Sequence, residues 1–201
     1  MSVASVAGLL LPGLDEGSAG SVGLGVAAGG LFLLVARRAL DPRHHHVERA
    51  RRTDVRTSIL VFVVLLVHSL PEGFAIGTAF ASDTEGLALF IFLAIALQNV
   101  PEGTSVAIPM ESAGFGHAQQ FWGAVLTSAP QPVGAVIAYL AVEEINGLLP
   151  FSFAFAAGAM LALVVAELAP EAYAAGGRLA AAAGTAVGAA LMLVLAALLG
   201  V

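Results

Sequence analysis

The chain contains no cysteine and no lysine, and only 11% of its 201 residues are charged. Without cysteine, neither a disulfide framework nor a thiolate metal site can form, so any bound metal must have oxygen and nitrogen ligands. The formal net charge of -6 leaves no basic surface for nucleic acid beyond one short loop. We therefore exclude nucleic acid as a partner.

Apolar residues make up 59% of the sequence, and the mean hydropathy is +0.93. A helix needs roughly 20 apolar residues to cross the hydrocarbon core of a bilayer. Six runs of about this length are present, at 21–36, 57–81, 86–110, 119–142, 149–170 and 179–201. The sequence predicts an all-α, polytopic transmembrane bundle that forms one membrane domain over 1–201 and has the lipid bilayer as its surroundings.

A shorter apolar run, "MSVASVAGLLLPGL", opens the chain and ends before Asp15 and Glu16. It is too short to cross a bilayer alone, and it has neither the basic start nor the small-residue cleavage pattern of a signal peptide. We therefore predict a partial membrane helix at the N-terminus.

Arginine is concentrated in one segment, because seven of the eight arginines lie between 37 and 56. By the positive-inside rule, this loop is predicted to be cytoplasmic. Alternation of the six spans then places 82–85 and 143–148 outside, 111–118 and 171–178 inside, and the C-terminus at Val201 outside. The eighth arginine, Arg178, lies on the predicted inner side.

A few polar residues interrupt the apolar spans. They include two similar stretches, "HSLPEGFAIGTAF" at 68–80 and "QNVPEGTSVAIPM" at 98–110, both near the middle of their predicted helices. An ionisable side chain at this depth costs about 2.5 kcal/mol or more, so by default it marks an ion or proton path. The candidates are His68, Glu72, Gln98, Asn99, Glu102, Gln131 and Glu167.

Each repeated stretch places a nitrogen- or oxygen-bearing side chain four residues before a glutamate, as in His68 and Glu72 or Gln98 and Glu102. This spacing puts both groups on one face of a helix, one turn apart. The proline between them has no N–H and clashes with the carbonyl four residues back, which frees that carbonyl for a cation. The following glycine lets a neighbouring helix approach closely.

If the two predicted helices pack together, Glu72 and Glu102 meet in an apolar place where their charges repel. A divalent cation between them would relieve this, and a proton-sharing structural pair is the alternative. Imidazole, amide and carboxylate ligands suit Zn²⁺, Fe²⁺, Mn²⁺ or Co²⁺ better than Cu⁺ or Ca²⁺. The enzyme motifs H-E-x-x-H and G-x-S-x-G are both absent from the sequence, so we do not predict an enzyme.

Together the paired Pro-Glu-Gly motifs resemble those of the ZIP (Zrt-, Irt-like) family of divalent metal transporters, most closely its prokaryotic branch. The resemblance extends over nearly the whole chain. It includes "LLLPGLDEG" at 9–17, "HHH" at 44–46, "SAPQPVGAVIAY" at 128–139 and "AELAPEA" at 166–172. The paired motifs are its most specific part.

This resemblance implies an eight-helix fold in which the first, fourth, fifth and sixth helices move against the others, with a binuclear metal site between the fourth and fifth. The first subsite would be His68, Glu72, Gln98 and Glu102. The two glutamates would bridge to a second subsite of Ser69, Asn99 and Gln131, and Glu167 joins the metal-binding set. Ser69, Gln98 and Gln131 depart from the family's more usual Asn, His and Glu, so we expect the second subsite to bind weakly.

The resemblance also implies a first helix, and most of a second, that the sequence lacks before residue 9. We expect an upstream extension, with a partner protein that fills the gap or a reduced variant as the alternatives. The expected function is transport of divalent metal, zinc first, and the alternative is a membrane metal-binding scaffold or sensor that does not transport. A second copy of the chain, as a homodimer, is the further partner that we consider.

Overall fold

The computed structural model describes residues 1–40 and 53–201, and every regular element within these ranges is a helix. The N-terminal helical segment consists of α1 (Ser2–Ser5), a wider turn at Val6–Leu10 and α2 (Leu11–Glu16). The remaining bounds are α3 (Ala19–Leu40), α4 (Thr53–Phe80), α5 (Leu87–Ser112), α6 (His117–Thr127), α7 (Pro130–Glu144), α8 (Leu148–Leu163), a second wide turn at Val164–Leu168, and α9 (Ala169–Leu199).

The six predicted spans are confirmed by six helical segments that are long and apolar enough to cross a membrane within the described residues. Their bounds are Ala19–Ala39, Val61–Phe80, Leu87–Ser112, His117–Glu144, Leu148–Ala174 and Gly176–Leu199. The chain is thus a multi-pass membrane protein. The N-terminal segment is helical, as predicted, and Leu9 belongs to the same buried core cluster as Phe90 of α5 and Phe153 of α8.

Both ends of the arginine-rich loop predicted at 37–56 are helical in the structure. Helix α3 continues to Leu40 and α4 begins at Thr53, while 41–52, including the three histidines at 44–46, lie outside the described residues. Arg37 and Arg38 occupy the last turn of α3. Cationic side chains favour this position because the helix dipole is negative there.

The span predicted at 119–142 is broken into α6 and α7 at Ser128 and Ala129. The cause lies in the sequence, since Pro130 has no N–H to donate to the carbonyl of Leu126. The N–H of Ala129 donates to that carbonyl instead (3.1 Å), and the N–H of Gln131 donates to Ser128 (3.0 Å) rather than to Thr127. In contrast, α4 and α5 stay helical through Pro71 and Pro101.

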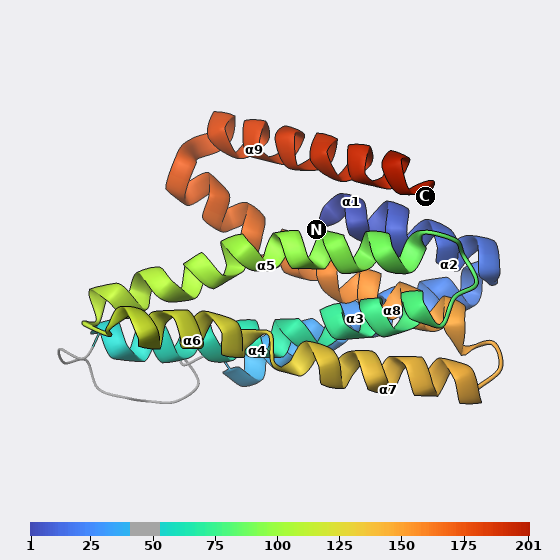
Figure 1. The fold of residues 1–201 in the computed structure, drawn as a ribbon, viewed down its shortest axis with the longest axis horizontal. Helices are drawn as coiled ribbons and strands as arrows, with labels where there is room; N and C mark the ends of the chain where they lie inside the picture. The colour runs from blue at the N-terminus through green and yellow to red at the C-terminus, as the bar shows by residue number, and fades with distance from the viewer. Residues whose placement is uncertain (41–52) are drawn as a thin grey trace.

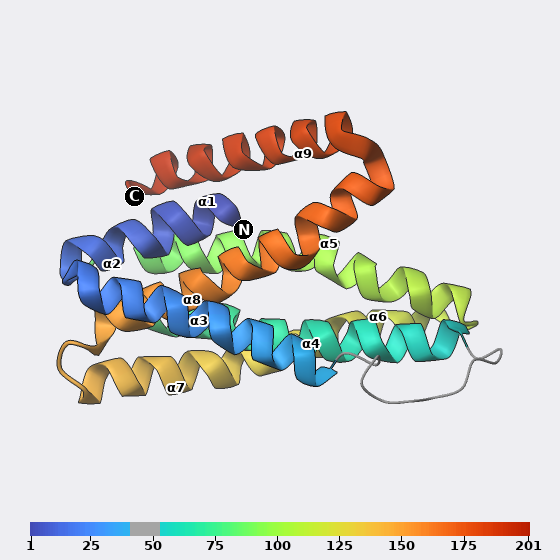
Figure 2. The same ribbon diagram turned by 180° about the vertical axis from the view of Figure 1, so that it is seen from behind.

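The inner loop predicted at 171–178 is replaced by a bend inside α9. Gly177 has φ 72° and ψ 173°, a left-handed backbone conformation that glycine adopts without steric cost. The chain therefore reverses direction at a single residue. Figures 1 and 2 show the first part of α9 leaving the bundle and the second part returning above α1.

Two helix pairs pack with their backbones in close contact. A Cβ added at Gly73 or Gly77 of α4 would overlap the carbonyl oxygens of Gln131 and Ala135 in α7. In the same way, a Cβ at Gly29 of α3 would overlap the carbonyl oxygen of Phe155 in α8. Small residues permit such close approach between membrane helices. The α4–α7 and α3–α8 pairs are therefore each tightly joined.

The connections alternate between the two ends of the bundle (Figure 1). One end carries the end of α3, the start of α4 and the α5–α6 connection. The opposite end carries the α2–α3, α4–α5 and α7–α8 connections and the C-terminus. The polar residues of the two repeated motifs lie between these ends, on α4 and α5.

Candidate metal site

Glu72 is the most deeply buried charged side chain of the motif residues, with 1% of its surface exposed. Two amides from other helices hold its carboxylate. Nε2 of Gln98 on α5 donates to Oε1 at 2.8 Å, and Nε2 of Gln131 on α7 donates to Oε2 at 2.7 Å. The close α4–α7 contact at Gly73 makes the second bond geometrically possible. Three helices thus meet at one carboxylate.

Glu102 and Asn99, both on α5, extend this cluster. The carboxyl group of Glu102 lies close to that of Glu72. The amides of Asn99 and Gln131 exchange two hydrogen bonds of 3.1 Å each. We call Glu72, Gln98, Asn99, Glu102 and Gln131 the amide–carboxylate cluster. It joins the two repeated motifs, as the sequence predicts.

Neutral groups provide the hydrogen bonds to Glu72, so they satisfy its oxygens without cancelling its charge. Two carboxyl groups therefore share an apolar interior with no cationic side chain bonded to Glu72 among the contacts of the described residues. The amide oxygen of Gln98 is buried and has no hydrogen-bond partner in the described part of the chain. Rotation of this amide would turn the oxygen toward Glu72.

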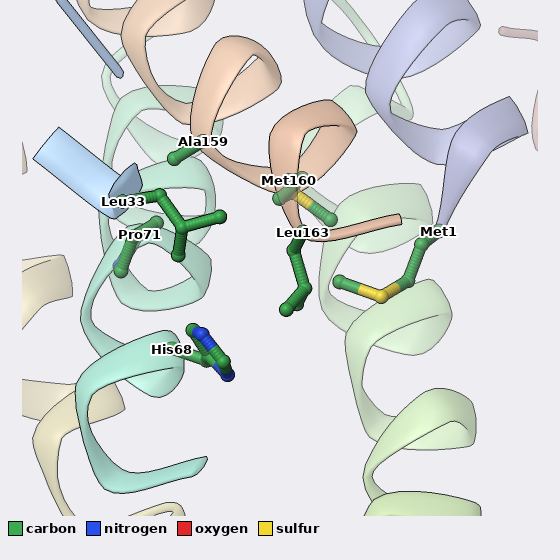
Figure 3. Close-up of a pocket in the computed structure, with 7 residues that line it drawn as sticks. All are labelled: Met1, Leu33, His68, Pro71, Ala159, Met160 and Leu163. Carbon is green, nitrogen blue, oxygen red and sulfur yellow. The ribbon is translucent and has the colours of Figure 1, made fainter. Parts of the chain in front are cut away.

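His68 lies one turn before Glu72 on α4 but belongs to a second cluster. Its Nε2 is 3.8 Å from Oε2 of Glu167, and Nε of Arg37 on α3 is 3.2 Å from Oε1 of the same carboxylate. Figure 3 shows the imidazole in a space lined by Leu33, Pro71 and Leu163 among others. The ring is 5% exposed, and its Nδ1 has no hydrogen-bond partner among the described residues.

Pro170 leaves a backbone carbonyl next to Glu167 without its usual helical N–H donor. Proline has no N–H to donate to the carbonyl of Ala166 four residues back. Nη1 of Arg37 donates to this carbonyl instead, at 3.1 Å. Glu167 itself lies in the wide turn Val164–Leu168, a form of helix that is frequent at functional sites.

Ser69 is placed away from the hydrogen bonds of the amide–carboxylate cluster. Its hydroxyl donates to the carbonyl of Thr127 at 2.7 Å and lies 3.1 Å from that of Leu65. The Thr127 carbonyl is available because the helix breaks before Pro130. Ser69 therefore ties α4 to the end of α6.

The structure divides the eight residues that the sequence singles out. Five form the amide–carboxylate cluster, His68 and Glu167 face each other elsewhere, and Ser69 bonds to α6. Among residues 1–40 and 53–201, no three histidine, aspartate or glutamate side chains converge in the manner of a ready-made metal site. The sequence analysis did not single out two polar groups of the site, Arg37 and the Thr127 carbonyl. Pro170 and Pro130 could have pointed to them, because each proline leaves a backbone carbonyl of its helix without its usual N–H donor, and a side chain binds there or nearby.

Comparison of the sequence with known proteins shows which family the chain belongs to. The profile described as ZIP zinc transporter matches residues 35–196, which include both Pro-Glu-Gly motifs and four of the six spans in full. The chain belongs to the ZIP family. The resemblance of the two motifs is thereby confirmed.

Several zinc transporters of the ZIP family are similar in sequence. A putative zinc transporter of Arabidopsis thaliana is 34% identical over 168 residues, which cover 82% of this chain and 27% of that protein. Zinc transporter GufA of Myxococcus xanthus is 36% identical over 156 residues, or 76% of this chain and 61% of GufA. Zinc transporter ZIPB of Bordetella bronchiseptica is 33% identical over 216 residues, or 100% of this chain and 68% of ZIPB. The matches thus cover only 27% and 61% of the first two relatives.

Proposed function

We propose that this chain transports divalent transition-metal cations across a cell membrane, with Zn²⁺ as the main substrate. The observation that supports the proposal most is Glu72, a carboxylate buried in the middle of an apolar bundle. It lies beside a second carboxyl group and accepts hydrogen bonds from the neutral amides of Gln98 and Gln131. Such a place stabilises a dication. Relatives named as zinc transporters support the choice of metal.

In this proposal the metal binds between Glu72 and Glu102. The buried amide oxygen of Gln98 supplies a third ligand after rotation of the amide, and the amide oxygens of Asn99 and Gln131 lie next to it. Oxygen ligands and one nearby imidazole suit Zn²⁺, and also Fe²⁺, Mn²⁺ or Co²⁺. Since Gln131 adds no charge, two dications would face only two carboxylates. One bound ion should therefore dominate.

His68 and Glu167 would form the next position on the path. Glu167 contacts Arg37 in the last turn of α3, so metal that moves from Glu72 to Glu167 would travel toward this end of α3. The close packing of α4 with α7, and of α3 with α8, would let each pair move as one unit. Glu72 would move with the first pair, while Glu167 stays with the second. We infer that the direction is uptake into the cytoplasm.

Removal of either bridging carboxylate tests the site. Glu72→Ala and Glu102→Ala are each expected to lower zinc uptake by a factor of about ten or more, because half of the charge at the ion is lost. Radioactive zinc uptake into cells that lack their own zinc transporters measures the effect. Glu143→Ala, an exposed position near the end of α7, is the matched control and should transport normally.

Membrane levels of each variant must match the unmodified chain for the comparison to count. Normal uptake by Glu72→Ala would refute the proposed site. If the purified chain binds zinc while uptake stays at background for every variant and for the natural sequence, the scaffold or sensor function replaces transport.

The proposed orientation places the arginine-rich end in the cytoplasm and the C-terminus outside. Positive residues favour the cytoplasmic side, and the alternating connections fix the rest. A membrane-impermeant thiol reagent applied to intact cells should label Asp83→Cys, between α4 and α5, and leave Ser112→Cys, at the end of α5, unlabelled. The natural chain has no cysteine, so the background is low. The reverse labelling pattern would show the opposite orientation.

A further inference from the structure

Arg37 carries a permanent positive charge at a position that the transported ion would otherwise use. It reaches from the last turn of α3 to the wide turn after α8, where it contacts the carboxylate of Glu167 and the carbonyl of Ala166. Both contacts lie within the α3–α8 pair. The guanidinium therefore stays with Glu167 when the α4–α7 pair moves.

The two oxygens of Glu167 face different partners. Oε1 is 3.2 Å from Nε of Arg37, whereas Oε2 is 3.8 Å from Nε2 of His68. Two ligand atoms on a tetrahedral zinc ion, each bonded at about 2.0–2.1 Å, are roughly 3.3 Å apart. A small approach of His68 and Glu167 would thus let both bind one ion. Nδ1 of His68 has no hydrogen-bond partner among residues 1–40 and 53–201, so these residues do not fix the tautomer of the ring.

We propose that Arg37 is a tethered cation that competes with the metal for Glu167, so that the inner position binds the ion weakly and releases it. This inference rests on the proposed transport function. When no metal is present, Arg37 neutralises Glu167. When an ion reaches His68 and Glu167, it and Arg37 compete for the same carboxylate.

The exposure of the two side chains fits this role. Arg37 is 46% exposed and Glu167 only 16%, so the guanidinium can withdraw to solvent while the carboxylate stays in place. Part of the interaction is screened by solvent for the same reason, and its effect on affinity should be moderate. A carboxylate and an imidazole without such a competitor would hold zinc longer.

Arg37→Gln tests the competition directly. Zinc binding to the purified full-length chain is measured by calorimetry, and zinc uptake is measured in proteoliposomes. We expect the second, weaker zinc ion to bind about three- to tenfold more tightly, since the competing charge is gone. Maximal uptake should fall severalfold, while the zinc concentration at half-maximal uptake decreases, because release becomes slow.

Two single variants act as controls. Arg37→Lys keeps a positive charge that can compete for Glu167, so the second zinc ion should still bind weakly, although one ammonium group does not replace both contacts of the guanidinium. Arg38→Gln removes the exposed neighbouring charge of α3 and should change little. If Arg38→Gln tightens binding as much as Arg37→Gln does, general surface charge is responsible and the inference is overturned.

A double variant shows whether Arg37 acts through Glu167. Arg37→Gln combined with Glu167→Gln should behave as Glu167→Gln alone, with no tightening of the second ion. This pair leaves no unpaired charge, so it also replaces Arg37→Gln if that variant does not accumulate in the membrane. A difference in zinc affinity between the double variant and Glu167→Gln would contradict the proposal.

Glu72→Ala, measured beside these variants, distinguishes a failure of the proposed metal site from a failure of the proposed role of Arg37. If Glu72→Ala loses uptake and Arg37→Gln matches the natural chain, only the role of Arg37 is wrong. If Glu72→Ala transports normally, the proposed site is wrong, whatever Arg37→Gln does.

Discussion

Glu72 and Glu167 are two carboxylates in membrane helices of the same bundle, and their neighbours differ in charge. Glu72 is held by the amides of Gln98 and Gln131, whereas Glu167 contacts the guanidinium of Arg37. Amides orient a carboxylate and leave its charge in place. A guanidinium orients it and cancels the charge.

This difference separates two tasks that a metal path must combine. In the proposed function, an ion has to leave water for the interior, where the carboxylate of Glu72 would attract it. It also has to leave the protein, which requires that no position on the path holds it too strongly. A glutamate with neutral neighbours, Glu72, would attract the ion, and a glutamate with a cationic neighbour, Glu167, would release it.

The test with the largest expected effect gives Glu72 a cationic neighbour, as Glu167 has in Arg37. Gln131→Lys places an ammonium group beside Glu72, and we expect zinc uptake to fall by a factor of about ten or more, since the carboxylate is then neutralised. Uptake in proteoliposomes measures the loss. Gln131→Met, of similar size and without charge, is the control and should retain more uptake than Gln131→Lys. Equal uptake by the two variants would mean that charge beside Glu72 does not matter.

A smaller effect is expected when negative charge is added at the same position. Gln131→Glu should bind zinc about tenfold more tightly or take up a second ion, because a third carboxylate then compensates the added charge. Calorimetric stoichiometry on the purified chain distinguishes the two results. Asn146→Asp, exposed between α7 and α8, controls for the change in net charge. Two equally tight ions in the natural sequence would contradict the one-ion prediction.

The sequence by itself determined the membrane architecture. Long apolar runs require helices in a bilayer, where each backbone polar group must be satisfied within its own segment, so the apolar runs alone predict the six spans. It also predicted that the two motifs can meet, because they lie at the same depth on consecutive helices, and Gln98 of one motif donates to Glu72 of the other. Pro130 similarly marks where α6 ends, although the single span predicted at 119–142 did not include this break.

Only the tertiary structure decided which residues share a cluster. Residues four apart on a helix lie on one side of it, yet His68 turns toward α3 and the wide turn after α8, while Glu72 turns toward α5 and α7. Arg37 meets Glu167 although the two lie far apart in the sequence, and Ser69 finds the carbonyl of Thr127. Such pairings depend on the close packing of α4 with α7 and of α3 with α8. Local spacing fixes the face of a helix, but the packing of neighbouring helices selects the partner.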